Sequence, residues 1–164
     1  MRLRPGWDVL NRGINGQRTE EILARFQRDV VQASPQYVII LAGVNDVYQG
    51  RPQESVRQSL SFMYARAVDA GIVPVAATIL PYNTASDSAS IAIRQLNGWI
   101  ESAARRLGIP LCDTNRAATD PNHPDRLLGT PDGFHPDIPG YRKMAEALVE
   151  TIDAVLRSGP RRRQ

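Results

Sequence analysis

The sequence predicts an α/β fold, a three-layer α/β/α sandwich in which helices cover both faces of a parallel, flavodoxin-like sheet. Apolar runs of strand length alternate along the chain with longer segments whose apolar residues recur at helical spacing. Connections of this kind cross over right-handedly and therefore place successive strands parallel in one sheet. The 164 residues are 42% hydrophobic and 23% charged, which is the composition of a globular protein.

Four strands are expected, each of them a short apolar run. In chain order they cover residues 7–10, 37–42, 73–79 and 109–112. The first is the end of a strand that leads directly into a glycine-containing turn. The second is a continuous apolar and β-branched run, a pattern typical of strands that are covered on both faces in a parallel sheet.

Four amphipathic helices are expected to follow these strands. The first has Thr19 as its N-cap, has two acidic residues in its first turn and ends near Ser34-Pro35. The other three cover residues 54–70, 91–107 and 141–156. Gly71 and Gly108 can supply the left-handed conformation that ends the second and third helices.

The chain is expected to form one domain over residues 1–158, followed by a basic disordered tail at 159–164. The formal net charge is +3, and three arginines lie in that tail, so the remaining charges balance (3 minus 3). A nucleic-acid-binding protein needs a basic stripe across a folded face, and the sequence does not predict one. No apolar run approaches the ~20 residues that span a bilayer, and residues 1–6 do not resemble a signal peptide, so a cytoplasmic location is the default expectation.

Any ligand site should lie in the loops that follow the strands, because open parallel sheets bind ligands at the carboxyl ends of their strands. The polar loops in these places cover residues 11–18, 43–52, 80–90 and 113–139. His123, in the last of them, is expected to be a surface residue. The lone cysteine, Cys112, is expected to be buried and structural, and it excludes an internal disulfide.

The segment Asp132-Gly-Phe-His135-Pro is the strongest chemical signal in the chain. Imidazole is the usual base near neutral pH, and a carboxylate beside one ring nitrogen fixes the tautomer and stabilises the charged ring. The pair Asp132 and His135 could supply both groups across a glycine turn. A bare Asp-x-x-His spacing is more often an ordinary surface turn.

Two further loops carry groups that could stabilise a developing oxyanion. Asn45 follows the buried strand in Gly-Val-Asn-Asp, and its amide could donate a hydrogen bond to such an oxygen, although asparagine is also a common turn residue. Asp46 is expected to cap or support a neighbouring element. Gly16 ends the turn Asn-Arg-Gly-Ile-Asn-Gly, which lacks the glycine spacing of a dinucleotide site.

These three blocks, in this order, resemble those of the SGNH hydrolases, the GDSL-type esterase-lipase family, over residues 9–149. The resemblance implies that Asp132 and His135 complete a Ser-His-Asp triad, and that Asn45 and the Gly16 N–H form the oxyanion hole. The first family block, a strand ending in Gly-Asp-Ser, does not occur in this sequence. Asp87-Ser88 is the nearest match, but it lies in a polar loop with no strand before it.

The resemblance therefore implies carboxylic-ester hydrolysis through an acyl-enzyme, with the serine supplied from outside this sequence and with no metal or other cofactor. The partner is a small-molecule or carbohydrate ester. In a flavodoxin-like order the missing N-terminal strand would lie between the first two strands expected here, so its absence should leave them either paired abnormally or separated by a gap with unpaired backbone groups. Two alternatives remain: an inactive SGNH-fold binding module for acylated carbohydrate, and a flavodoxin-like domain that holds an anion at residues 13–16.

Overall fold

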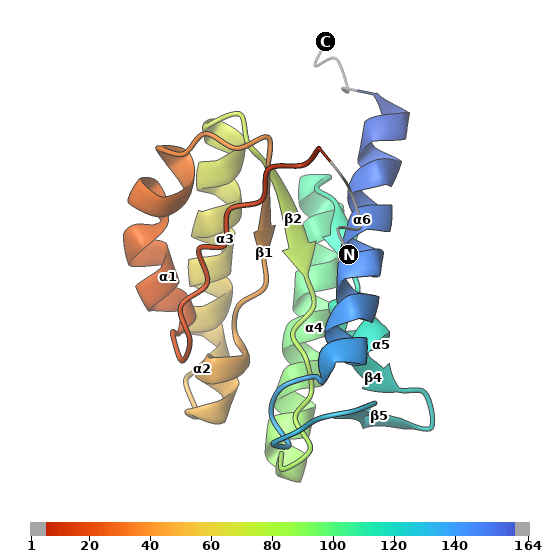
Figure 1. The fold of residues 1–164 in the computed structure, drawn as a ribbon. Helices are drawn as coiled ribbons and strands as arrows, with labels where there is room; N and C mark the ends of the chain where they lie inside the picture. The colour runs from red at the N-terminus through yellow and green to blue at the C-terminus, as the bar shows by residue number, and fades with distance from the viewer. Residues whose placement is uncertain (1–5, 160–164) are drawn as a thin grey trace.

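The computed structural model describes residues 6–159 (Figure 1), so all but the first residue of the expected tail at 159–164 lies outside the described residues. The elements, in chain order, are α1 (Thr19–Phe26), a π-helical turn (Gln27–Val31), β1 (Tyr37–Ile40), α2 (Val44–Tyr48), α3 (Gln53–Asp69), β2 (Val73–Ala77), α4 (Asp87–Leu107), β3 (Leu111–Cys112), α5 (Thr114–Ala118), β4 (Thr119–Asp120), β5 (His123–Leu127) and α6 (Ile138–Ser158).

The main sheet is parallel, in the order β1-β2-β3, as the alternation of apolar runs predicts. On one face, Ile40 and Ala76 pack against α3 and α4 in the largest apolar core. On the other face, Val75 and Cys112 pack against Ile152 of α6. The predicted α/β fold with helices on both faces of a parallel sheet is confirmed (Figure 1).

The expected strand at residues 7–10 is wrong, because this segment is extended coil that pairs with nothing in the described structure. Val9 is 76% exposed and Leu10 is 57% exposed. Within residues 6–159, β1 pairs only with β2, so the other edge of β1 has no strand against it. Two apolar side chains at that strand, Ile39 and Leu41, are 42% and 40% exposed. A strand needs a hydrogen-bonded neighbour, and the first expected strand has none here.

Helix α1 begins differently from the prediction. Arg18, rather than Thr19, precedes its first turn, and the Glu21 carboxylate accepts a hydrogen bond from the Arg18 backbone N–H at 2.9 Å. Thr19 is instead the first helical residue, and it is buried. Threonine is a common N-cap, and this is why the sequence predicts Thr19 there. In the structure the Thr19 hydroxyl instead donates a hydrogen bond to the Asp46 carboxylate in α2.

The long loop expected at 113–139 contains helix α5 and an antiparallel hairpin of β4 and β5. These elements are short and polar, and they lack the apolar alternation by which strands are recognised in a sequence. Helix α6 begins three residues before its expected start, where the Asp137 carboxylate accepts a hydrogen bond from the Gly140 N–H at 2.8 Å. Helix α4 begins four residues early, and Ser86 caps it.

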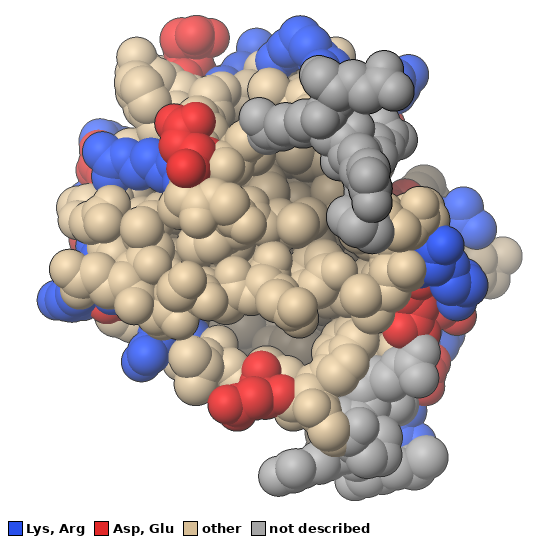
Figure 2. Space-filling model, turned by 90° about the horizontal axis from the view of Figure 1, so that it is seen from above, with Lys and Arg blue, Asp and Glu red and all other residues tan. Residues whose placement is uncertain are grey.

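Charged side chains are mixed on the end of the molecule that Figure 2 shows. Seen from above, the centre of this face is uncharged and hollowed, while Lys and Arg lie around its margin together with Asp and Glu. This end lies opposite the carboxyl ends of β1 and β2, which point downward in Figure 1.

Gly43 sits where β1 leaves the sheet for α2, and its position explains the glycine in Gly-Val-Asn-Asp. Its φ is +124°, a conformation that side chains rarely adopt. A Cβ placed there would lie 2.9 Å from Leu96 Cδ2 and 3.5 Å from Ile79 Cγ2. Leu96 and Ile79 are fully buried, so neither can move aside into solvent.

We expect Gly43→Ala to lower the free energy of unfolding by about 2–4 kcal/mol, from backbone strain and overpacking together. Gly50→Ala is the matched control. Gly50 also has a positive φ, of +65°, but nothing lies within 4 Å of the added methyl, so its cost should stay near 1 kcal/mol. Urea unfolding of both variants checks this, and equal losses would contradict a role for close packing at Gly43.

Candidate active site

Asp132 and His135 form a tight turn in which the carboxylate holds the imidazole ring. His135 Nδ1 lies 2.7 Å from Asp132 Oδ2. The other carboxylate oxygen accepts hydrogen bonds from the backbone N–H groups of Phe134 and His135, both at 2.8 Å. Gly133 between them has a φ of +81°, which explains its presence in the turn. The aspartate therefore fixes both the ring and the backbone that carries it.

The electrostatics of this turn favour an ionised aspartate. The hydrogen bond with the His135 ring, followed by the two backbone hydrogen bonds, holds the pKa of the Asp132 carboxyl well below its usual range. Both side chains are about half exposed, at 46% for Asp132 and 55% for His135. A permanently charged carboxylate on Nδ1 leaves Nε2 as the nitrogen that can exchange a proton with a substrate.

The loop that carries His135 is tied to the loop that follows β2. The Asn83 N–H donates to the Gly133 carbonyl at 2.7 Å, and the Asn83 side chain accepts a hydrogen bond from the Leu127 N–H at 2.8 Å. Asn83, in the loop after β2, thus links that loop to the Asp132–His135 turn and to the end of β5. The turn is therefore fixed both by the hydrogen bonds of Asp132 within it and by the hydrogen bond from Asn83 in a neighbouring loop.

Asn45 and the turn that contains Gly16 lie next to each other. Asn45 is in the first turn of α2, and its amide Nδ2 donates to the Gln17 carbonyl at 3.0 Å. Gly16 immediately precedes that residue and has a φ of +78° in an exposed turn. The asparagine amide has two N–H groups, so one of them serves this contact and the other is left to donate elsewhere. The two expected oxyanion donors are therefore neighbours.

Asp46 connects α2 to the start of α1, in line with the supporting role expected from the sequence. The carboxylate is buried, accepts a hydrogen bond from the Thr19 N–H at 3.0 Å and accepts another from the Thr19 hydroxyl at 2.8 Å. A carboxylate beside the first residue of a helix satisfies a free backbone donor and also interacts favourably with the helix dipole. Asp46 therefore fixes α2, which carries Asn45, to the start of α1.

Three aromatic rings join the two halves of the site. The Tyr48 ring, at the end of α2, lies 5.6 Å from the Phe134 ring in an edge-to-face arrangement, and Tyr82 contacts both. Since Tyr48 is in the same short helix as Asn45, and Phe134 directly precedes His135, both groups lie at one edge of the molecule. This is the lower edge in Figure 1, where β1 and β2 end.

This aromatic cluster was not predicted from the sequence. Tyr48 ends α2, Tyr82 lies in the loop after β2 and Phe134 lies in the loop before α6, and no periodicity connects them. Asn97, a buried residue of α4, was not predicted as a site residue either. Its Oδ1 accepts a hydrogen bond from the Ile79 N–H at 2.7 Å, and its Nδ2 donates one to the Ile79 carbonyl at 2.9 Å. A single asparagine in an amphipathic helix is expected to be a surface residue. The role of Asn97 in fixing the loop after β2 is therefore seen only in the folded structure.

A second Asp-x-x-His pair lies in the hairpin. His123 Nδ1 is 3.0 Å from Asp120 Oδ2, and the His123 side chain is 66% exposed, so it is a surface residue as expected. The pair copies the spacing and the contact of Asp132 and His135. It differs in its surroundings. The pair lies in the β4–β5 hairpin, whereas Phe134, next to His135, contacts Tyr48 of the helix that carries Asn45. Spacing alone does not define the candidate site.

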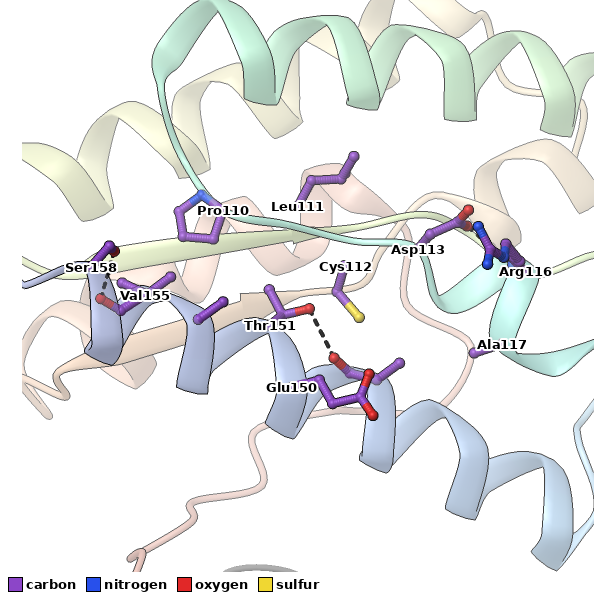
Figure 3. Close-up of a pocket in the computed structure, with 12 residues that line it drawn as sticks. Pro110, Leu111, Cys112, Asp113, Arg116, Ala117, Glu150, Thr151, Val155 and Ser158 are labelled. Atoms are coloured by element: carbon purple, nitrogen blue, oxygen red, sulfur yellow. Dashed lines mark hydrogen bonds between the residues drawn. The ribbon is translucent and has the colours of Figure 1, made fainter.

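The two described cavities lie away from these residues. One, of about 670 Å³, opens between β3, α5 and α6 (Figure 3), and the other, of about 240 Å³, lies beside α4. Neither is lined by Asp132, His135, Asn45 or Gly16. Cys112 borders the larger one and is buried as predicted, and burial raises the pKa of its thiol. A neutral thiol is a poor nucleophile, so Cys112 is not a candidate for the nucleophile.

Between residues 6 and 159, no three His, Cys, Asp or Glu side chains are grouped so that they could hold a metal ion. Over the same residues, no helix combines the length and the apolar character needed to cross a bilayer.

The chain is similar to curated proteins over part of its length. It is 37% identical over 84 residues to the uncharacterized lipoprotein YqeF of Bacillus subtilis, covering 48% of this chain and 35% of that protein. It is 39% identical over 44 residues to an acetylxylan esterase of Geobacillus stearothermophilus, covering 27% and 20%. The matched part thus spans about a third or less of each curated relative.

Family and structure comparisons extend over most of the chain. The crystal structure of a GDSL-like lipase from Bacteroides thetaiotaomicron superposes with a TM-score of 0.79 and 28% identity, over 88% of this chain and 75% of that one. The family model for GDSL-like lipases and acylhydrolases matches residues 1–143. The chain therefore belongs to the GDSL-like lipase/acylhydrolase family, as the SGNH blocks in its sequence predict.

Proposed function

We propose that this chain provides most of a serine ester hydrolase that works through an acyl-enzyme. The observation that carries the proposal is the 2.7 Å contact between Asp132 and His135, at the same edge of the sheet as Asn45 and the Gly16 turn. In this proposal His135 is the general base and then the general acid, Asp132 orients it, and the Asn45 amide and the Gly16 N–H stabilise the oxyanion.

The chemical steps follow from these positions. His135 Nε2 removes the proton from a serine hydroxyl as the serine oxygen attacks the ester carbonyl, and the negative charge that forms on the carbonyl oxygen is stabilised by the Asn45 and Gly16 donors. The C–O bond to the alcohol then breaks, and the imidazolium returns its proton to the departing alcohol. Water, activated by His135 in the same way, releases the acid and the free serine.

The serine is the group that this sequence does not provide, and we propose that it lies in an upstream strand ending in Gly-Asp-Ser. The free edge of β1 supports this proposal. Ile39 and Leu41 are partly exposed there, and Val9 and Leu10 in the unpaired N-terminal segment are largely exposed. A strand inserted between residues 7–10 and β1 would pair the free edge and bury these apolar side chains.

The substrate in this proposal is a short-acyl ester, including acetylated carbohydrate, since the acetylxylan esterase similarity points in that direction. A second candidate function is binding of acylated carbohydrate without catalysis. It is favoured by one observation, the absence of a Gly-Asp-Ser block from the sequence. Turnover by a longer version that carries the upstream segment distinguishes the two functions.

We expect hydrolysis of p-nitrophenyl acetate by that longer version to survive EDTA unchanged, because the proposed mechanism assigns every step to side chains and backbone N–H groups. The measurement compares initial rates before and after chelation, with an added-zinc arm. Loss of turnover in EDTA and its recovery with zinc would indicate a metal-activated water, and the serine mechanism would be wrong.

A further inference from the structure

Two exposed aromatic rings lie near the proposed catalytic histidine, since Phe134 directly precedes His135 in the chain and Tyr48 contacts Phe134. Tyr48 is 60% exposed and Phe134 is 39% exposed, whereas Tyr82 beneath them is 6% exposed. Tyr82 and Phe134 are stacked at 5.7 Å with an interplanar angle of 21°, and Tyr48 meets both rings edge-on. We call Tyr48, Tyr82 and Phe134 the aromatic wall.

The wall is held in place rather than exposed by chance. The Tyr82 ring is buried, and Phe134 stacks against it. The Asn83 N–H, next to Tyr82, donates to the Gly133 carbonyl, next to Phe134, at 2.7 Å. Single exposed apolar side chains on a protein surface need no explanation, but rings from separate parts of the chain that gather near a proposed catalytic residue indicate a ligand surface.

The surroundings of the wall favour a ring-shaped polar ligand over a long acyl chain. Tyr48 and Phe134 are 60% and 39% exposed, so their rings face solvent, whereas a long acyl chain is stabilised by apolar surface that encloses it. Polar side chains border the rings: Asn83, which follows Tyr82, is only partly buried, and Asp132 and His135, on either side of Gly133 and Phe134, are about half exposed. Flat apolar ring faces with polar groups at the rim match a pyranose, which has apolar C–H faces and hydroxyls around its edge.

We propose that Tyr48 and Phe134 bind the sugar ring of the ester substrate and so determine its alcohol part. This inference rests on the proposed function, since it takes the Asp132–His135 turn as the reacting end of the same site. Tyr48 and Phe134 are specificity residues in this proposal. They take no part in proton transfer.

The test is a binding measurement on residues 1–164, which separates it from any test of turnover. We expect xylobiose, titrated while ¹H–¹⁵N spectra are recorded, to shift the amide signals of residues around Tyr48 and Phe134. Tyr48→Ala and Phe134→Leu should each weaken this binding at least tenfold, while Tyr48→Phe should retain it because the ring remains. Tyr141→Ala and Phe62→Ala are matched controls, since both rings are 50% exposed and lie outside the wall.

Two results would overturn the proposal: unchanged xylobiose affinity in Tyr48→Ala and Phe134→Leu, or shifts at the wall caused by methyl butyrate and not by xylobiose, which would identify an acyl site. Normal binding by these residues, combined with no ester turnover in any longer version, would overturn the proposed catalysis and leave the sugar site standing.

Discussion

In a longer version of the chain that carries the upstream Gly-Asp-Ser strand, His135→Ala should lower kcat for p-nitrophenyl acetate by at least about a thousandfold. Removing the base of a serine triad leaves only the slow reaction that the oxyanion hole and substrate binding support. His135 is fixed by Asp132 at 2.7 Å and lies at the edge that also carries Asn45. Steady-state kinetics with matched protein concentrations provides the measurement.

His123→Ala is the control that the fold itself supplies. His123 has the same three-residue spacing from an aspartate and a similar contact, at 3.0 Å, but it lies in the β4–β5 hairpin. We expect it to retain wild-type kcat and KM. A large loss in His123→Ala with little loss in His135→Ala would move the site to the hairpin and contradict the assignment of the catalytic base.

The same longer version should be more stable than residues 1–164, with a Tm higher by about 10 °C. An added strand would pair the free edge of β1 and cover Ile39 and Leu41, which are now 42% and 40% exposed. A gain of about 4 kcal/mol corresponds to a shift of this size in a domain of this length. Turnover should rise by at least about 10⁴-fold at the same time, because the nucleophile is restored.

Replacing the serine of the added block with alanine separates these two effects. That variant should keep the whole gain in Tm and lose the whole gain in turnover. Thermal melting and ester hydrolysis on the three proteins check this. If the added segment leaves Tm unchanged, or if residues 1–164 hydrolyse the ester as fast as the longer version, the free edge of β1 is not the place of a missing strand.

The sheet could be predicted from the sequence, since each of its three strands is an apolar run followed by a helical pattern. The run at 37–42 shows both success and failure. Its strand character is correct, but the strand ends at Ile40, because Gly43 must turn the chain into α2 beneath Leu96. That turn depends on packing against α4, a helix more than 40 residues further along the chain. Local sequence patterns carry no such information.

Residues 7–10 show the opposite case, in which a plausible local pattern is not realised. The apolar pair Val9-Leu10 predicts a strand, yet a strand forms only when a neighbour provides hydrogen bonds. The candidate site was predictable where residues adjacent in sequence act together, as in Asp132-Gly-Phe-His135. The aromatic wall could not be predicted, because Tyr48, Tyr82 and Phe134 meet only when the end of α2 and two loops come together in the fold.

Labelling with a fluorophosphonate, followed by peptide mapping, tests whether His135 activates a serine that lies outside residues 1–164. The reagent reacts with a serine only where a base activates the hydroxyl and an oxyanion hole stabilises the product. We expect the longer version to be labelled at the serine of its Gly-Asp-Ser block, His135→Ala to abolish the labelling, and residues 1–164 to remain unlabelled. A label on any serine within residues 1–164 that is lost in His135→Ala would show that this chain carries its own nucleophile, and would contradict the account.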